Sequence, residues 1–396
     1  MGTFIWVLFC WFTCIISAFI ELPPLLGSYP VGTRRLEVID QARLDPYAPS
    51  PQPRTLTLQI WYPIEADEYL TPATWLPPHA SAFFENELSL PPGILSLIKT
   101  HVSYNGTAIF PLTDEENETT PILVFSPGFG ALTEQYTSIL SSLASYGYTI
   151  IGVEHPYDSS PLERTDGSLV LRNDSAPLSF PLATVTRRAD VLFLASQISQ
   201  AMLCSWLPSS TPCGERGIGA KVRLGIFGHS SGGNTASWAM KDRSTLYEAS
   251  VSLDGAFFPP LNETGFNGPV FYMAAETSCC GGLLKEQLEE TWPFIQGWKT
   301  VVQINKTAHA SFSDLVVLQK YLPNDPDDVL GDVGTIDGER MVKIVVEYVR
   351  AFWDWTLRGE KIDGILEKES KLFPEVVFKD LIGDGNGEFY LKKQEM

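Results

Sequence analysis

The sequence is poor in positive charge. It holds 28 lysines and arginines against 47 aspartates and glutamates, which gives a formal net charge of −19. Proteins grip nucleic acids and strongly anionic membranes through clusters of Lys and Arg. The charge balance therefore argues against binding through a basic patch of that kind, and we expect no nucleic-acid partner. A neutral or cationic small molecule is compatible with it.

Recognisable metal and dinucleotide motifs are also lacking. No Cys and His spacing resembles a metal site, and the G-x-G-x-x-G pattern is absent. We therefore expect neither a metal nor another cofactor. Histidine itself is scarce, since 396 residues contain only His79, His101, His155, His229 and His309.

Long hydrophobic runs are rare too, and the single one stands at the start. Thr3 to Ile20 carries no charge and ends near the small residues Ser17 and Ala18. It is typical of a signal peptide over residues 1–18, and the alternative is an uncleaved anchor that tethers the protein to a membrane. Five N-x-S/T sites agree with a secreted glycoprotein: Asn105, Asn117, Asn173, Asn262 and Asn305.

Cysteine usage fits the same compartment. Without Cys10 and Cys14 of the first segment, four cysteines remain: Cys204, Cys213, Cys279 and Cys280. A bridge from Cys204 to Cys213 would close a short loop. The adjacent Cys279 and Cys280 either bridge each other or stay free.

Apolar runs alternate with helical periodicity through most of the chain. Buried strands are predicted at 121–126, 148–153, 223–228, 249–253, 269–275 and 300–304, with helices between several of them. This order predicts an α/β fold with a mostly parallel central sheet and helices on both faces. The clearest N-terminal strand is Thr55 to Tyr62, whose alternation favours antiparallel pairing with one buried face.

We divide the chain accordingly. Residues 19–363 form one catalytic domain, and 364–396 form a charged surface tail. Residues 65–120 are an excursion from the sheet with apolar residues between Phe83 and Ile98. That excursion is either a lid or interfacial region that makes transient contact with lipid, or a flap packed on the core by its own apolar face.

The most informative stretch is RLGIFGHSSGGN at 223–234. It contains G-x-S-x-G around Ser230, with a strand before it and a helix after it. A serine on such a turn is exposed above the sheet, and the flanking glycines let the two backbones cross closely. This context predicts that Ser230 is a nucleophile.

A serine nucleophile needs a base, and that base needs an acid to orient it. In this kind of fold the three residues follow one another as Ser, Asp or Glu, then His. His309 is the only histidine after Ser230. Asp254 ends the next predicted strand, whereas Asp314, Asp325 and Asp332 do not end one.

The oxyanion of an acyl transfer needs two backbone N–H donors. We expect one from Ser231, the residue after the nucleophile. The other is expected from Phe129, because Gly128 and Gly130 let that loop approach a substrate.

These pieces together resemble the plasma-type (isoform II) platelet-activating factor acetylhydrolase family of α/β-hydrolases. The matching motifs are IWYP at 60–63, FSPGFG at 125–130, VEH at 153–155, GHSSGG at 228–233, LDG at 253–255 and HASFSD at 309–314. Members often carry His where Pro127 stands and Phe where Ser231 stands, which bears on acyl preference.

The resemblance implies a calcium-independent esterase that removes short or oxidised acyl groups from the sn-2 position of phospholipids. It also implies that Ser230, Asp254 and His309 form the triad, with Phe129 and Ser231 as oxyanion donors. The alternative is a general carboxylesterase or lipase acting on another ester or a lactone. A non-enzymatic binding role is disfavoured because all three triad candidates are present.

Overall fold

The computed structural model describes residues 20–66, 70–109, 119–173, 179–199, 203–208, 221–241, 247–258, 264–279, 282–321, 331–383 and 389–392. The predicted signal peptide, Asn117, Asn262, Cys213 and Cys280 lie outside these ranges, and so does the side chain of Cys204. Among the described helices, none is long and apolar enough to cross a membrane.

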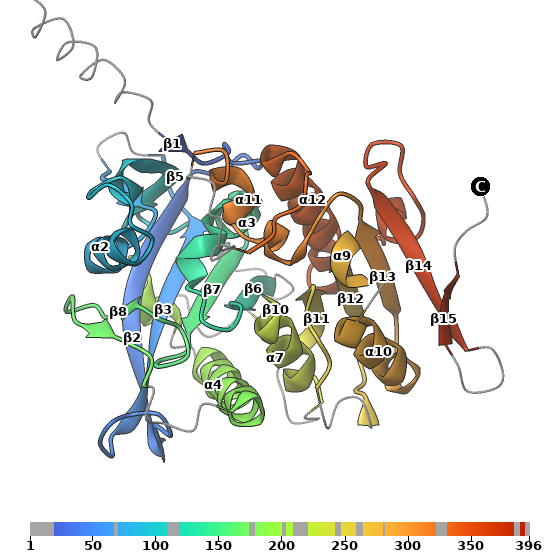
Figure 1. Cartoon of the computed structure of the whole chain (residues 1–396), viewed down its shortest axis with the longest axis horizontal. Helices are drawn as coiled ribbons and strands as arrows, with labels where there is room; N and C mark the ends of the chain where they lie inside the picture. Colours follow the sequence, from blue (N-terminus) through green and yellow to red (C-terminus); the bar gives the residue numbers. More distant parts are fainter. Residues whose placement is uncertain are drawn as a thin grey trace, which may run out of the picture.

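One large mixed sheet runs through the molecule in the order β1-β5-β2-β3-β7-β6-β10-β11-β12-β13-β14-β15 (Figure 1). Its strands are β1 (Ile20–Glu21), β2 (Val31–Leu44), β3 (Pro53–Pro63), β5 (Ile98–Tyr104), β6 (Thr119–Ser126), β7 (Thr149–Glu154), β10 (Lys221–His229), β11 (Tyr247–Leu253), β12 (Val270–Ala275), β13 (Lys299–Ile304), β14 (Val376–Gly383) and β15 (Phe389–Lys392). A short strand, β4 (Pro72–Thr74), pairs with β5, and β8 (Leu162–Glu163) forms a separate hairpin with β9 (Leu169–Val170).

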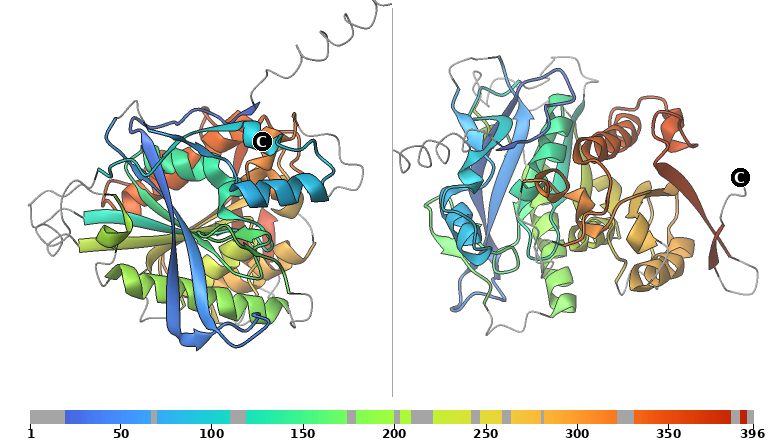
Figure 2. Two further views of the ribbon diagram at one scale, coloured as in Figure 1. Left: turned by 90° about the vertical axis from the view of Figure 1, so that its left-hand side faces the viewer. Right: turned by 45° about the horizontal axis from the view of Figure 1, so that its top comes forward.

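Adjacent strands in the central part of the sheet, in the order β7-β6-β10-β11-β12-β13, are parallel, as predicted. The N-terminal pair β2 and β3 is antiparallel. Strand β3 also runs antiparallel to β7, which joins the two parts of the sheet. In Figure 2 the blue strands β2 and β3 cross the direction of the green central strands, as the twist of a large sheet requires.

Helices cover both faces. On one face α3 (Thr137–Ser145) and α12 (Gly338–Thr356) pack together, and on the other α4 (Phe180–Ser199) packs against α7 (Ser231–Ala239). The shorter helices are α2 (Pro78–Glu87), α5 (Leu203–Trp206), α9 (Glu276–Cys279), α10 (Gly282–Thr291) and α11 (Leu315–Leu318), with 3₁₀ turns η1 (Leu95–Leu97), η2 (Thr133–Tyr136), η3 (Trp292–Phe294), η4 (His309–Phe312) and η5 (Gly364–Leu366).

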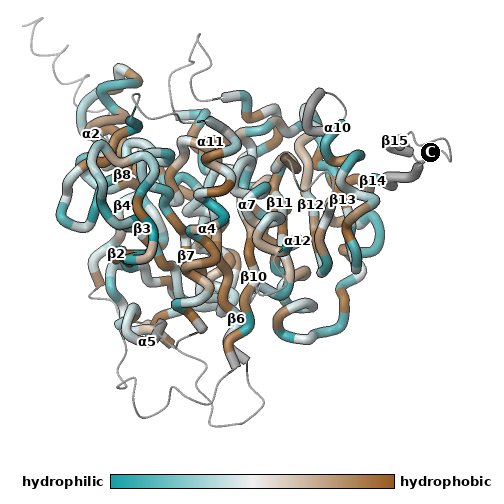
Figure 3. Tube along the Cα trace, turned by 90° about the horizontal axis from the view of Figure 1, so that it is seen from below, coloured by the Kyte–Doolittle hydropathy of each residue, from teal (hydrophilic) through white to brown (hydrophobic). Residues whose placement is uncertain are grey.

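The core is divided by the sheet into two clusters. Side chains alternate across a strand, so Leu123 and Phe125 of β6 join the cluster under α3 and α12, while Ile122 and Val124 join the one under α4. All four are fully buried, which explains why β6 reads as an unbroken apolar run. Figure 3 shows the resulting hydrophobic centre along β6, β7 and β10.

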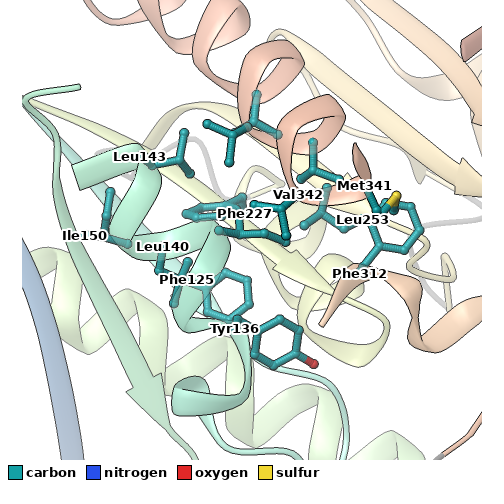
Figure 4. Packing of buried hydrophobic residues seen from close by; sticks show 14 of the residues in the cluster. Phe125, Tyr136, Leu140, Leu143, Ile150, Phe227, Leu253, Phe312, Met341 and Val342 are labelled. Carbon is teal, nitrogen blue, oxygen red and sulfur yellow. The ribbon is translucent and has the colours of Figure 1, made fainter. Parts of the chain in front are cut away.

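The first cluster reaches the edge of the candidate site. Phe125 packs on Phe227 and on Tyr136, with ring centroids 4.9 and 4.8 Å apart. In Figure 4 the ring of Tyr136 lies beside Phe125 and its hydroxyl points out of the cluster. Packed aromatic rings therefore support the hydroxyl of Tyr136 at the edge of the cluster.

The prediction that residues 65–120 lie outside the sheet is wrong for Ile98–Tyr104. That segment is β5, which pairs in parallel with β1 and β2. Only Ile98 and Val102 of β5 are buried, so polar residues hide its period in the sequence. The apolar residues before it favour the flap interpretation, since Leu90 and Leu95 are buried in the core and Phe84, Leu88 and Ile94 pack against it.

The predicted surface tail also differs from the structure. Val376 to Lys379 form part of β14, which extends the central sheet by pairing antiparallel with β13. The charged residues around it conceal a short alternation in which Val376 is buried. Residues 377–379 of this strand are only half-buried, and the sequence of the strand therefore resembles that of a tail.

Candidate active site

Ser230 lies on the turn between β10 and α7. Its backbone has φ 55° and ψ −121°, a conformation that L residues rarely adopt. The turn tolerates no side chain at Gly232, where a Cβ would lie 1.8 Å from the carbonyl oxygen of Ser126. The G-x-S-x-G spacing is thus explained by the close crossing of β6, β10 and α7, which leaves Ser230 half-buried at the sheet edge.

The structure brings the three predicted triad residues together. His309 Nε2 lies 2.9 Å from Ser230 Oγ, and His309 Nδ1 lies 2.6 Å from Asp254 Oδ2. The three residues follow β10, β11 and β13, whose carboxyl ends meet at the same edge. His309 is 46% exposed whereas Asp254 is fully buried, so the chain of hydrogen bonds runs from solvent to the interior.

Asp254 is held by more than the histidine. Its Oδ1 accepts from the N–H of Ala275 at 2.8 Å, and its Oδ2 accepts from Ser278 Oγ at 2.7 Å. A carboxylate with these donors is fixed in orientation, and it in turn fixes the ring of His309 with Nδ1–H toward Oδ2. Nε2 is then free of a proton and can accept the one on Ser230.

The predicted oxyanion loop, Pro127 to Gly130, lies against the nucleophile. A Cβ on Gly128 would come 3.7 Å from that of Ser230. The N–H of Gly128 donates to Tyr136 Oη at 3.1 Å, and that of Gly130 donates to Asp158 Oδ1 at 3.3 Å. The other predicted donor, Ser231, is the first residue of α7, where N–H groups have no acceptor within the helix.

His229 ties three loops of the site together, a role that the sequence did not reveal. Tyr136 Oη accepts from Gly128, so its proton goes to His229 Nδ1 at 2.9 Å. His229 Nε2–H then donates to the carbonyl of His309 at 2.9 Å. Burial, together with the neighbouring His309, lowers the pKa of His229 well below its usual value and keeps it neutral. The only hint in the sequence was its place beside Ser230.

His155 lies deeper, at the end of β7. Its Nδ1 is 2.9 Å from Asp190 Oδ2 and its Nε2 is 2.9 Å from Ser126 Oγ. Burial lowers its pKa to about 4, so Nδ1–H donates to the carboxylate and Nε2 accepts from the serine. His155 therefore supports the end of β6, not the reacting atoms.

Two buried carboxyl groups lie beside the same strand. Glu154 Oε1 accepts from the N–H and hydroxyl of Thr133, at 2.6 and 2.5 Å. Burial, and then the nearby Glu134, raises the pKa of Glu154 to about 8. Arg35 Nε lies 3.6 Å from Glu134 Oε1.

We expect Glu154 to make the protein less stable in alkali. A carboxyl whose folded pKa is about 8 stabilises the fold below its unfolded pKa of about 4.3, and the contribution is lost as the pH rises through 8. Glu154→Gln copies the protonated form. Its free energy of unfolding should exceed that of the wild type by a few kcal/mol more at pH 9 than at pH 5, roughly.

Urea unfolding at the two pH values measures this difference. Glu375→Gln is the matched control, because Arg340 lowers the pKa of Glu375 and its contribution is constant above pH 5. Parallel curves for Glu154→Gln and the wild type would show that Glu154 is not protonated in the folded state.

Three of the predicted glycosylation sites lie within the described residues. Asn105 is exposed and Asn305 is half-buried, while Asn173 Nδ2 donates to the carbonyl of Tyr47 at 2.8 Å. Within the described residues no group of three or more His, Cys, Asp or Glu side chains could hold a metal ion.

Comparison with known proteins finds a matching family model and two similar proteins. A family model for platelet-activating factor acetylhydrolase, isoform II, matches residues 14–166. A protein of Arthroderma benhamiae described as a probable 1-alkyl-2-acetylglycerophosphocholine esterase is 27% identical over 92% of this chain and 95% of its own. A putative phospholipase A2 of Schizosaccharomyces pombe is 28% identical over 35% of this chain and 34% of its own.

One solved structure is similar over almost its whole length. The ferulic acid esterase from Streptomyces cinnamoneus superposes with a TM-score of 0.74 at 28% identity, covering 91% of this chain and 99% of that one. With the parallel sheet and the nucleophile turn, these matches define the chain as a carboxylic ester hydrolase with the α/β-hydrolase fold. The match of residues 14–166 to the family model and the likeness to the Arthroderma protein support a relationship to the isoform II platelet-activating factor acetylhydrolase family.

Proposed function

We propose that the protein is a secreted serine esterase that hydrolyses short sn-2 acyl esters of phospholipids without calcium. The observation that carries the chemistry is the hydrogen-bonded chain Ser230–His309–Asp254. The name of the Arthroderma relative, a probable 1-alkyl-2-acetylglycerophosphocholine esterase, supports the substrate because that relative aligns over 92% of this chain.

The reaction begins when Ser230 Oγ attacks the sn-2 carbonyl carbon and passes its proton to His309 Nε2. Asp254 stabilises the resulting imidazolium through Nδ1–H. The carbonyl electrons move onto the oxygen, and the N–H groups of Phe129 and Ser231 hold that oxyanion. Collapse breaks the ester bond, and the departing lysolipid alkoxide takes the proton from His309.

In the second half of the reaction, hydrolysis of the acyl-enzyme, water takes the place of Ser230 as the nucleophile. A water molecule gives its proton to His309 and attacks the acyl-enzyme carbonyl. The second tetrahedral intermediate releases the short carboxylic acid, and Ser230 regains its proton from His309. Each proton and electron pair is accounted for by side chains of this site, and the mechanism needs no calcium.

A second candidate is an ester without a phospholipid head group. The ferulic acid esterase favours it, because its fold and identity match this chain over 91% of the length. Both candidates use the same triad and differ only in what surrounds the ester. The choice between them is therefore a question of relative kcat/KM.

A substrate panel tests the proposal. The purified protein is assayed with a 2-acetyl ether phosphocholine, a soluble aryl acetate and methyl ferulate, each with a calcium chelator. We expect turnover of the first two, with the phospholipid having the higher kcat/KM. Turnover of the aryl acetate or ferulate alone would discard the phospholipid and retain the esterase.

Secretion rests on the apolar segment 1–18 and the sequons, of which Asn105 is exposed. Expression of the full chain in a eukaryotic host should place it in the medium, with a mass that falls on treatment with an N-glycosidase. Retention in the membrane fraction would favour the uncleaved anchor.

A further inference from the structure

A buried ion pair lies behind the oxyanion loop, and neither the sequence motifs nor the triad account for it. Arg187 of α4 binds Asp158, with its Nε 2.5 Å from Oδ2 and its Nη2 2.7 Å from Oδ1. Both side chains are only 1% exposed. Burial opposes ionisation of Asp158, yet the guanidinium lowers the pKa of that carboxyl below its usual value.

Besides a contact of 3.5 Å from Nη1 to Ser126 Oγ, the remaining donors of Arg187 go to the loop backbone. Nη1 donates to the carbonyl of Pro127 at 2.6 Å, and Nη2 donates to the carbonyl of Gly128 at 3.0 Å. Asp158 Oδ1 accepts from the N–H of Gly130. The pair therefore holds three consecutive peptide groups, 127–128, 128–129 and 129–130.

The peptide group 128–129 carries the N–H of Phe129, the predicted oxyanion donor. In a planar trans peptide the C=O and N–H point in opposite directions. The carbonyl of Gly128 is directed at Arg187, so the N–H of Phe129, which shares its plane, points away from Arg187. A hydrogen bond from a cation to that carbonyl also polarises the peptide and strengthens its N–H as a donor.

We propose that Arg187, fixed by Asp158, is the positioning residue of the oxyanion hole, which orients the N–H of Phe129 before substrate binds. The inference rests on the proposed role of Phe129 as an oxyanion donor. Arg187 does not touch the reacting atoms. It acts together with two neighbouring hydrogen bonds on the same loop: the N–H of Ala131 donates to the carbonyl of Gly128 at 3.2 Å, and the N–H of Gly128 donates to Tyr136 Oη at 3.1 Å.

Arg187→Lys is the informative substitution. Lysine keeps the charge for Asp158, but a single ammonium cannot reproduce the planar fork that reaches two carbonyls as well as the carboxylate. We expect kcat on an aryl acetate to fall roughly 10- to 100-fold, with a much smaller change in KM, as displacement of one oxyanion donor would cause.

Arg54→Lys is the matched control. Arg54 is just as buried and belongs to the neighbouring ion pair with Asp190, but its donors reach Asp45 and the carbonyl of Pro156, not the loop. It should lower the Tm by a similar amount and leave kcat within about 3-fold. Equal losses of kcat in both variants would show that general loosening, not positioning, is responsible.

A trifluoromethyl ketone gives a second measurement, since it forms a hemiketal whose oxyanion occupies the same hole. Its Ki should rise in Arg187→Lys by the same factor as kcat/KM falls, whereas partial unfolding would leave Ki unchanged. If Arg187→Lys does not fold, the double variant Arg187→Met with Asp158→Leu removes both charges, and the same kinetic loss is expected.

An unchanged kcat in a folded variant would overturn the positioning role. That result is separable from failure of the proposed function, because Ser230→Ala would still be inactive. Activity that survives in Ser230→Ala would instead remove the catalytic assignment on which the hole depends.

Discussion

Ser230→Ala lowers kcat by about five to six orders of magnitude on any ester that the protein turns over. Removing the nucleophile of a Ser-His-Asp site costs roughly this much, and the residual rate comes from the oxyanion hole and binding. The KM should change little, because the hydroxyl is not expected to contribute to ground-state binding. Steady-state kinetics on an aryl acetate provide the measurement.

The fold should tolerate this change. Ser230 has a positive φ of 55°, which alanine adopts at a cost similar to that of serine. The backbone contacts of the turn, such as the N–H of Ser230 to the carbonyl of Leu253 at 2.9 Å, remain. A Tm within a few degrees of the wild type confirms that the loss is chemical. More than about 1% residual activity would contradict the assignment.

Asp254→Asn should lower kcat by about 10⁴-fold. The N–H of Ala275 keeps the amide oxygen of Asn on its own side, so Nδ2 faces His309 Nδ1. Nδ1 of His309 must then accept a hydrogen bond from the amide, so the ring proton moves to Nε2. A proton on Nε2 blocks proton transfer from Ser230. The cause is the wrong tautomer in an intact site.

Two comparisons separate this explanation from structural damage. The rate of Asp254→Asn should recover in part at high pH, where hydroxide can replace the base. The control Ser278→Ala removes one hydrogen bond to the same carboxylate at 2.7 Å but leaves the charge, and we expect a loss of less than about 10-fold. A similar loss in both variants would mean that Asp254 acts only by packing.

The sequence was sufficient to predict the strands and helices whose hydrophobic pattern is clear. The parallel strands are buried on both faces, so β6 and β10 appear as apolar runs, and the triad follows from their order in the chain. Strand β3 shows the limit. Its alternation predicted a single buried face, but Thr57 and Gln59 are buried too, with Gln59 Nε2 donating to Thr33 Oγ1 at 2.7 Å.

The groups that hold the site could not be found in this way. Arg187, Asp158 and Tyr136 come from a helix, a loop and a 3₁₀ turn, and each would pass as a surface or core residue in its local context. Their function arises because the fold aims them at the same loop. Hydrogen bonds between distant segments leave no period in the sequence, whereas chain order and strand ends do.

Identification of the acyl-enzyme tests directly whether Ser230 is the nucleophile. The protein is mixed with a 2-acetyl ether phosphocholine, quenched in acid during turnover, digested and analysed by mass spectrometry. We predict one acetyl group on Ser230 in the wild type and none in Ser230→Ala. Turnover without acetylated Ser230, or with the acetyl group on another residue, would show that Ser230 is not the nucleophile.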